Sequence, residues 1–385
     1  MRTIKLFLLC SIIIIILSNQ SYSLPRFSLR LDGKCMDCHV NPTGGEMRNH
    51  DGWTWSKNSL AMISPHKDFK MTNKLTPNIE FGFDYRGNYL IAKNEPYTKS
   101  IKSDFQKMEG SIYTSVSLAQ KIEAYARYDF IWGIWEAYGL AKILPNHGYI
   151  KGGSFMPNYG IRIDDHTAYI KGGDLGYLFT TGKRQGLIYD PTYVETGVEI
   201  GEYISNFVFI TASVGHPNTS LGASPGLFST DPTYTARVEF TPEVSNLFSL
   251  SFGGSFASFK DQKFINGRFG YNNVNMFGGF AGISIGELVL QGEFDMANNY
   301  MQFDSSTTAM MVQAAYTIRK GIDAVVRYDR FDPNVKLNND DHSRIILGLE
   351  IQPYSFVEIR PQYRIQMEHP DVKNNSFVAQ FHIFY

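Results

Sequence analysis

The sequence has few cysteines, no long apolar segment and no excess of charge. Only Cys10, Cys35 and Cys38 are present among its 385 residues. No stretch supplies the ~20 consecutive apolar residues that a transmembrane helix requires. The formal net charge is −1, from 36 basic and 37 acidic residues, so no basic surface for nucleic acid is expected. These absences argue against a helical membrane protein and against a nucleic-acid-binding protein.

The N-terminus has the features of a signal peptide over residues 1–23. Two basic residues precede an apolar run at 6–17, and residues 21–23, Ser-Tyr-Ser, have the small-x-small form of a cleavage site. We expect the mature chain to begin near residue 24, outside the cytoplasm. Cys10 would be removed with the peptide.

The two remaining cysteines form a single C-x-x-C-H motif, Cys35-Met36-Asp37-Cys38-His39. In a c-type haem site the two thiols add to the haem vinyl groups as thioethers, and the adjacent imidazole becomes the proximal iron ligand. The motif therefore predicts one haem c, attached through Cys35 and Cys38, with His39 on the iron. Export agrees with this prediction, because haem is attached to this motif outside the cytoplasm.

Three other interpretations of the motif have less support. A structural zinc ion needs four protein ligands, and the sequence has no second Cys or His pair to provide them. A thioredoxin-like dithiol belongs at the start of a helix in a βαβ unit, which the flanking residues do not suggest. A disulfide stays open as an alternative, although two intervening residues make a tight loop.

Several nearby side chains are candidates for the second axial position on the iron. Met47 is the first choice, and His50 and His66 follow it. Met62 and Met71 are further candidates. The alternative role of each methionine is to fill space beside the haem, and of each histidine to lie at the surface.

From residue 77 onward apolar and polar residues alternate, which predicts an all-β fold. Ile345, Leu347, Leu349 and Ile351 are expected to face outward, and Arg344, Gly348 and Glu350 inward. Aromatic residues make up 14% of the chain, which suits a barrel with an apolar outside and aromatic girdles.

The connections alternate between short turns and long loops, as in outer-membrane barrels. We therefore expect a transmembrane antiparallel β-barrel of about 16 strands over residues 77–385. The expected strands are approximately 77–91, 105–118, 121–132, 135–144, 147–157, 193–201, 206–214, 233–241, 247–259, 272–285, 287–297, 306–319, 321–331, 342–352, 355–368 and 376–385. Residues 158–192 and 260–271 are expected to be long outside loops. The short connection at Gly133 is an exception to the alternation of short turns and long loops. An even strand number places both barrel ends on the periplasmic side.

Two parts of the chain resemble known families. Residues 25–52, with Pro25-Arg26-Phe27 and C-M-D-C-H-V-N-P-T-G-G-E-M-R-N, resemble the N-termini of fused outer-membrane cytochrome-porins, in which a monohaem segment precedes a porin-like barrel. Met47 matches a methionine position of that family. The resemblance implies electron transfer across the outer membrane, including in iron oxidation.

Residues 151–160, K-G-G-S-F-M-P-N-Y-G, resemble the strand-to-loop segment of phosphate-selective porins, which implies a long loop folded into the lumen. The basic pair Lys183-Arg184 in this loop is read as a solvated loop tip.

These observations predict a signal peptide at 1–23, a small monohaem segment at 24–76 and a porin-like barrel at 77–385, located in the outer membrane. The haem segment is expected on the periplasmic side or inside the lumen. The predicted function is electron transfer between a periplasmic carrier, such as a cytochrome, and an extracellular redox partner. The alternative is a diffusion porin, with or without a preference for anions, that has a haem-bearing plug or tether. A redox enzyme at an open iron is a third interpretation.

Two further expectations concern the inside of the barrel. Arginines are expected to line the lumen and carboxylates to help hold the N-terminal segment: Arg127, Arg237, Arg327, Arg344, Arg360, Arg364, Glu239, Glu350 and Glu358. The N-terminal segment is expected to fold into the barrel mouth as a plug, because no linker separates it from the first strand. A haem left at the rim would leave most of the ~30 Å hydrocarbon layer uncrossed.

Overall fold

The computed structural model describes most of the chain from residue 25 to residue 385. Its description leaves out residues 32, 64–71, 94–100, 164, 174–185, 218–230, 243, 246–247, 266–267, 301–303, 370 and 372. The predicted signal peptide at 1–23 therefore lies outside the described residues. The same is true of His66, Met71 and the pair Lys183-Arg184.

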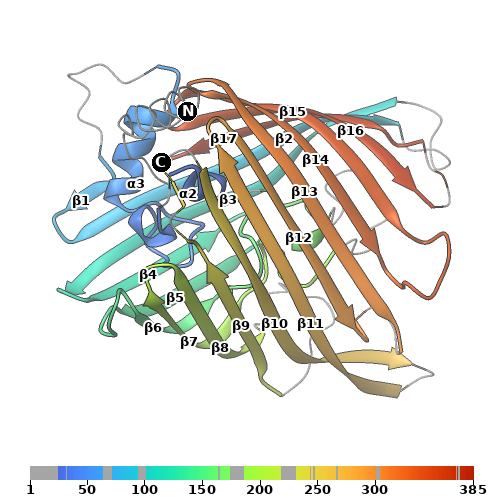
Figure 1. The fold of residues 1–385 in the computed structure, drawn as a ribbon, viewed down its shortest axis with the longest axis horizontal. Helices are drawn as coiled ribbons and strands as arrows, with labels where there is room; N and C mark the ends of the chain where they lie inside the picture. Colours follow the sequence, from blue (N-terminus) through green and yellow to red (C-terminus); the bar gives the residue numbers. More distant parts are fainter. Residues whose placement is uncertain are drawn as a thin grey trace, which may run out of the picture.

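Sixteen long antiparallel strands form a closed barrel, as predicted (Figure 1). They are β2 (Ile79–Lys93), β3 (Ile101–Ala119), β4 (Ile122–Asp129), β5 (Ile134–Ala141), β6 (Tyr149–Phe155), β7 (Glu195–Ser205), β8 (Val208–Pro217), β9 (Thr233–Phe240), β10 (Phe248–Ile265), β11 (Arg268–Ile285), β12 (Leu288–Asn298), β13 (Ser306–Arg319), β14 (Ile322–Asp332), β15 (His342–Tyr354), β16 (Val357–Glu368) and β17 (Ser376–Phe384). Each strand pairs with the next, and β17 pairs with β2 to close the ring. Each strand of the closed barrel is paired on both sides. A β-sheet in a membrane requires this, because lipid offers no hydrogen-bond partner to an exposed backbone group.

The described N-terminal segment contains short elements and one extra strand. These are α2 (Pro25–Leu31), the 3₁₀ turn η1 (Cys35–Asp37), α3 (His50–Trp55), η2 (Ser56–Leu60) and β1 (Lys74–Thr76), which pairs with β2. Sequence reasoning missed β1 because a strand of three residues has no readable alternation. Within the described residues, no helix is long and apolar enough to span a bilayer.

The side chains of β15 face alternately out of and into the barrel, as predicted. Leu347 and Leu349 are 44% and 37% exposed, whereas Arg344 is fully buried and Glu350 nearly so. The other strands also expose large apolar side chains on the outer surface. An apolar outer surface around a polar interior is the arrangement that a lipid bilayer stabilises.

A charge at Leu347 should therefore destabilise the barrel. Leu347 lies midway along β15, and we expect Leu347→Glu to lower the free energy of unfolding by roughly 2 kcal/mol, because the carboxylate would face the hydrocarbon. Gln362→Glu is the matched control, since Gln362 faces the lumen from β16 beside Gly348. Gly348 itself is a poor control because an added Cβ would lie 2.9 Å from Gln362 Cγ. Urea titration of the folded protein in detergent measures both effects, and equal effects would contradict the assigned faces.

The N-terminal segment lies inside the barrel, in agreement with the predicted plug. Arg26 forms ion pairs with Glu350 and Asp323, and Ser249 Oγ donates a hydrogen bond to Leu29 O. Figure 1 places α2 and α3 at the end of the barrel where the chain terminates. The segment therefore occupies the lumen at this end.

One predicted loop is wrong. Residues 260–271 were expected to form a long outside loop, but β10 continues to Ile265 and β11 begins at Arg268, with Lys260 opposite Asn273 and Ile265 opposite Arg268. The polar residues in this stretch obscured the strand pattern. The missed signal is Asn266-Gly267, because Asn-Gly between two alternating stretches is the strongest short-range indication of a hairpin. The short connection at Gly133 is confirmed, since β4 ends at Asp129 and β5 begins at Ile134.

Candidate functional site

The C-x-x-C-H motif is held in a compact turn inside the barrel. His39 N donates to Cys35 O at 3.0 Å, which closes the turn over the motif. Asn49 then ties the motif to α3: its Nδ2 donates to Met36 O at 3.1 Å, and its Oδ1 accepts from Gly52 N at 2.9 Å. Asn49 is thus the N-cap of α3 and a clamp on the motif. Sequence reasoning missed this role, although Asn is a favoured N-cap residue.

The double glycine after the motif is required by its conformation and its neighbours. Gly44 and Gly45 have φ values of +83° and +78°. In this left-handed region of backbone conformation, a residue with a Cβ atom is strained. A Cβ on Gly44 would lie 3.3 Å from Cys35 Sγ. A Cβ on Gly45 would lie 3.3 Å from Arg162 Nη1. The two glycines therefore allow the backbone to pass between Cys35 and Arg162.

Cys35, His39 and Met47 line one cavity in the lumen, which we call the motif cavity. It contains about 1410 Å³ of space free of protein atoms, counting its open mouth. Cys38 is fully buried but is not part of the cavity wall, and neither cysteine is in a disulfide. Met47 also packs against the barrel wall, where a Cβ on Gly82 would lie 3.3 Å from its Cγ.

The structure separates two other candidate iron ligands, His50 and Met62, from the motif cavity. His50 Nδ1 lies 3.1 Å from Asn73 Oδ1. Met62 lies against Gly321 in the turn between β13 and β14. The candidates His66 and Met71 lie outside the described residues. Among the described candidates, Met47 shares a cavity with His39, and its role on iron stays a prediction.

Burial shifts the pKa values of His39 and Cys35, the two reactive groups of the motif cavity. Burial, with the positive charge of Arg48, lowers the pKa of His39 to about 4, so the imidazole is neutral at physiological pH. Burial, with the negative charge of Glu239, raises the pKa of Cys35 to about 11, so the thiol is protonated. A neutral imidazole is the form that binds a metal. Together with the apolar rings of Phe83 and Phe384 in the cavity wall, Cys35 and His39 suit one thioether and the iron bond of a haem c, whereas the buried thiol of Cys38 would have to turn toward the cavity to form the second thioether.

The barrel and its long inner loop add residues that sequence reasoning missed. Met156, His166 and His382 line the motif cavity. His166 Nε2 lies 3.0 Å from Glu109 Oε2, and both nitrogens of His382 contact carboxylates. No local sequence signal identifies them, because barrel closure brings them to the motif from more than 100 residues away.

The loop between β6 and β7 is called here the lumen loop (residues 156–194), and its described residues fold into the barrel as predicted. Gly160 anchors it: Gly160 N donates to Ser255 Oγ at 2.9 Å, and Gly160 O accepts from Arg237 Nε at 2.9 Å. Next to it, Ile161 N donates to Glu293 Oε2. The K-G-G-S-F-M-P-N-Y-G segment thus ends at the residue that fastens the loop to the opposite wall.

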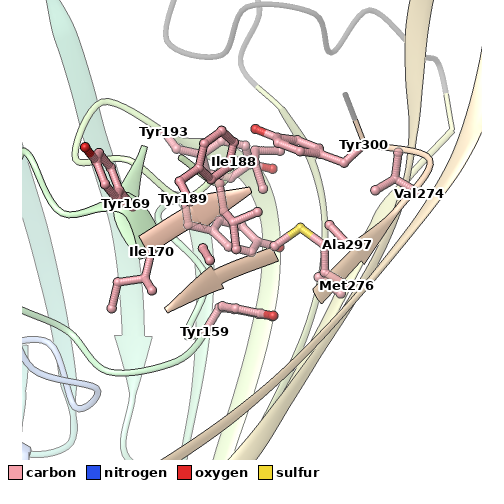
Figure 2. Close-up of a cluster of buried hydrophobic side chains, with 14 of the residues drawn as sticks. Tyr159, Tyr169, Ile170, Ile188, Tyr189, Tyr193, Val274, Met276, Ala297 and Tyr300 are labelled. Carbon is pink, nitrogen blue, oxygen red and sulfur yellow. The ribbon is translucent and has the colours of Figure 1, made fainter. Parts of the chain in front are cut away.

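An apolar cluster fixes the outer part of the lumen loop (Figure 2). Tyr189 lies between Tyr159 and Tyr193, with ring centroids 5.1 and 5.0 Å apart. These rings pack against Met276 and Ala297 on β11 and β12. Buried aromatic side chains contribute much of the packing energy of a core. The described part of the loop is thus attached to the wall over a broad area.

The predicted lumen arginines are buried, and two of them, besides Arg237, also hold the loop. Arg327 pairs with Asp165 at 2.6 Å, and Arg344 donates to Thr167 O. Burial alone would raise the pKa of Asp165, but the surrounding arginines, Arg327 first, hold it well below its usual range. Asp165 is therefore charged over the physiological pH range. Glu350, expected to help hold the N-terminal segment, pairs with Arg26.

Replacing Gly160 should release the lumen loop. Its φ is +60°, and an added Cβ would lie 1.8 Å from Glu293 Oε1. We expect Gly160→Ala to lower the free energy of unfolding by at least ~1–2 kcal/mol and to expose the loop to protease. Gly152→Ala is the control from the same segment, since nothing lies within 4 Å of its added Cβ. Protease sensitivity equal in both variants would contradict the anchoring role.

Comparison with known proteins identifies the fold. No protein-family model matches the sequence, and no curated protein matches it. Among solved structures, OprB of Pseudomonas putida matches with a TM-score of 0.59 at 11% identity, over 80% of this chain and 94% of that one. OmpF of Salmonella typhi, in complex with daunomycin, matches with a TM-score of 0.53 at 10% identity, over 80% and 98%. The anion-selective porin of Comamonas acidovorans matches with a TM-score of 0.52 at 9% identity, over 80% and 99%.

The chain therefore has the fold of the outer-membrane porins. The closed antiparallel barrel of 16 strands matches that class. At 9–11% identity the likeness concerns the fold alone.

Proposed function

We propose that the protein is an outer-membrane electron conduit that carries one covalent haem c inside a porin-like barrel. The observation that carries this proposal is the shared cavity of Cys35 and His39 within the lumen. A C-x-x-C-H motif on an exposed tether would have no contact with the barrel. In this protein, by contrast, the barrel wall and the lumen loop surround the motif.

Each part of the proposed site has a separate task. Cys35 and Cys38 would hold the haem through thioethers, and neutral His39 would bind its iron. The haem, when bound, supplies one-electron chemistry. The barrel separates the site from lipid, while the N-terminal segment and the described part of the lumen loop occupy part of the lumen. This obstruction favours electron transfer over solute flow.

The proposed partners follow from the two ends of the barrel. Short turns and both chain ends face the periplasm in barrels of this class, so a periplasmic carrier such as a cytochrome would dock beside α3. An extracellular redox partner would exchange electrons at the end with the longer loops. Outer-membrane lipid would cover the apolar strand faces.

The second candidate function is a diffusion porin in which the N-terminal segment is a plug or tether. The structural neighbours favour this function, since they are porins and one is described as anion-selective. Its test is single-channel conductance. A large, steady conductance through the full-length chain would support the porin and contradict the closed conduit.

Covalent haem is the first experimental requirement of the conduit. The protein, produced in cells that can attach haem c, should keep its haem after denaturation and acid-acetone extraction. Mass spectrometry should find the haem on the peptide that contains Cys35 and Cys38. Free extraction of the haem, or an unmodified peptide, would overturn the proposed function and leave the porin fold intact.

A further inference from the structure

We infer that Arg162 of the lumen loop binds a haem propionate in the motif cavity. This inference rests on the proposed function and extends it, because it assigns a residue of the porin part to the cofactor. Arg162 is not part of the C-x-x-C-H motif, and sequence reasoning gave it no role.

Arg162 joins the lumen loop to the N-terminal segment. Its guanidinium lies against Gly45, whose added Cβ would be 3.3 Å from Nη1. Nη2 donates to Met156 O at 3.0 Å, which holds the side chain across its own loop. Arg162 and Cys35 both line the motif cavity, and both also line a second cavity beside it. A haem attached at Cys35 would therefore share its cavity with this guanidinium.

The other well-defined cations of the motif cavity already have close partners. Arg127 lies 2.7 Å from Glu109 and 2.8 Å from Glu136. Lys171 Nζ donates to Tyr159 O at 2.9 Å and lies 3.7 Å from Glu293.

Two arginines complete this set. Arg86 Nε lies 3.1 Å from Asp84 and 3.5 Å from Glu109. Arg48 stacks on the ring of Phe384, 4.3 Å from its centroid. These side chains are thus engaged by the protein.

Arg162 has a weaker set of contacts. Its ion pair with Glu46 spans 3.8 Å, beyond hydrogen-bond length. Its Nε is buried and has no hydrogen-bond partner among the described residues. The Arg162 side chain is only 13% exposed, so solvent does not replace the missing partner.

A buried guanidinium in this state favours an added anion. Burying a charge is costly unless it is paired and hydrogen-bonded. The planar fork of Arg binds a carboxylate through two parallel hydrogen bonds, for which Nε is one of the suitable donors. Haem carries two carboxylates on flexible propionate chains. A propionate in the motif cavity would give this guanidinium a closer anionic partner than Glu46 does at 3.8 Å.

The test is the midpoint potential of the haem in the full-length protein in detergent. A nearby positive charge favours the reduced iron, so Arg162→Gln should lower the midpoint potential, and Arg162→Lys should restore part of the difference. Lys171→Gln is the control, because it removes a charge of the same sign from the same loop and cavity but one that already has partners. We expect its shift to be smaller. The propionate bending mode in the resonance Raman spectrum should move in Arg162→Gln and not in Lys171→Gln.

The possible outcomes separate the inference from the function on which it rests. Covalent haem with equal potentials and unchanged propionate modes in wild type and Arg162→Gln would overturn the inference and leave the conduit in place. A wild-type potential that shifts with added acetate at constant ionic strength, and no longer does so in Arg162→Gln, would mean that Arg162 binds a free anion instead. A chain that holds no covalent haem would overturn both. Migration of the unheated protein on a gel checks that each variant has folded.

Discussion

A variant in which Cys35 and Cys38 are both serine should carry no covalent haem and should transfer no electrons across a membrane. Serine hydroxyls cannot form the thioethers that hold a haem c. The barrel should still assemble, because the contacts that seat the segment are made elsewhere, by Arg26 and Leu29. Pyridine haemochrome spectra and mass spectrometry measure the haem. Electron transfer is measured in proteoliposomes.

The conductance of this double variant should equal that of the wild type. The plug remains in place without its haem, so solute flow stays blocked. His50→Gln is the control for electron transfer, since His50 bonds to Asn73 and lies outside the motif cavity. Electron transfer that survives in the double variant would contradict a role for haem at this motif.

Removal of residues 24–72 should raise single-channel conductance several-fold and abolish electron transfer as well. This truncation stops before β1, so the pairing of β1 with β2 is kept. It removes α2, the motif and α3 from the lumen, together with the ion pair between Arg26 and Glu350. The lumen loop should remain anchored by Gly160, so the pore should open only in part.

Conductance separates this truncation from the cysteine variant. Both should lose electron transfer, but only the truncation should open the pore. Adding Gly160→Ala to the truncation should raise conductance further, because the second obstruction would then be released. Unchanged conductance after truncation would mean that the segment does not block the barrel in the membrane.

The barrel could be predicted from the sequence because the alternation of apolar and polar residues along a strand is a local pattern. Alternation along a strand such as β15 fixes which side chains meet lipid, and this pattern can be read without the fold. The pair Asn266-Gly267 also indicates a hairpin in the sequence, but the polar residues around it obscure the alternation. The motif Cys35 to His39 was likewise readable, because its chemistry requires adjacent residues.

The surroundings of the motif could not be predicted in the same way. His166, His382 and Arg162 reach the motif cavity through the closure of the barrel and the inward course of the lumen loop. Each has an ordinary local sequence, and a one-residue change of register would turn a strand residue such as His382 to the lipid side. Their positions therefore follow from the assembled barrel. Met47 as the second iron ligand also stays a prediction, because no local sequence signal identifies the second ligand.

In the proposed conduit, electrons cross the membrane through a barrel that is closed to solutes. The most direct measurement uses proteoliposomes that contain the full-length chain and a sealed-in redox dye. An external electron donor or acceptor too large to enter the barrel is then added. The dye should change its oxidation state with the wild-type chain and keep it with the chain whose Cys35 and Cys38 are serine. A dye that stays unchanged with the haem-loaded wild-type chain would contradict the conduit.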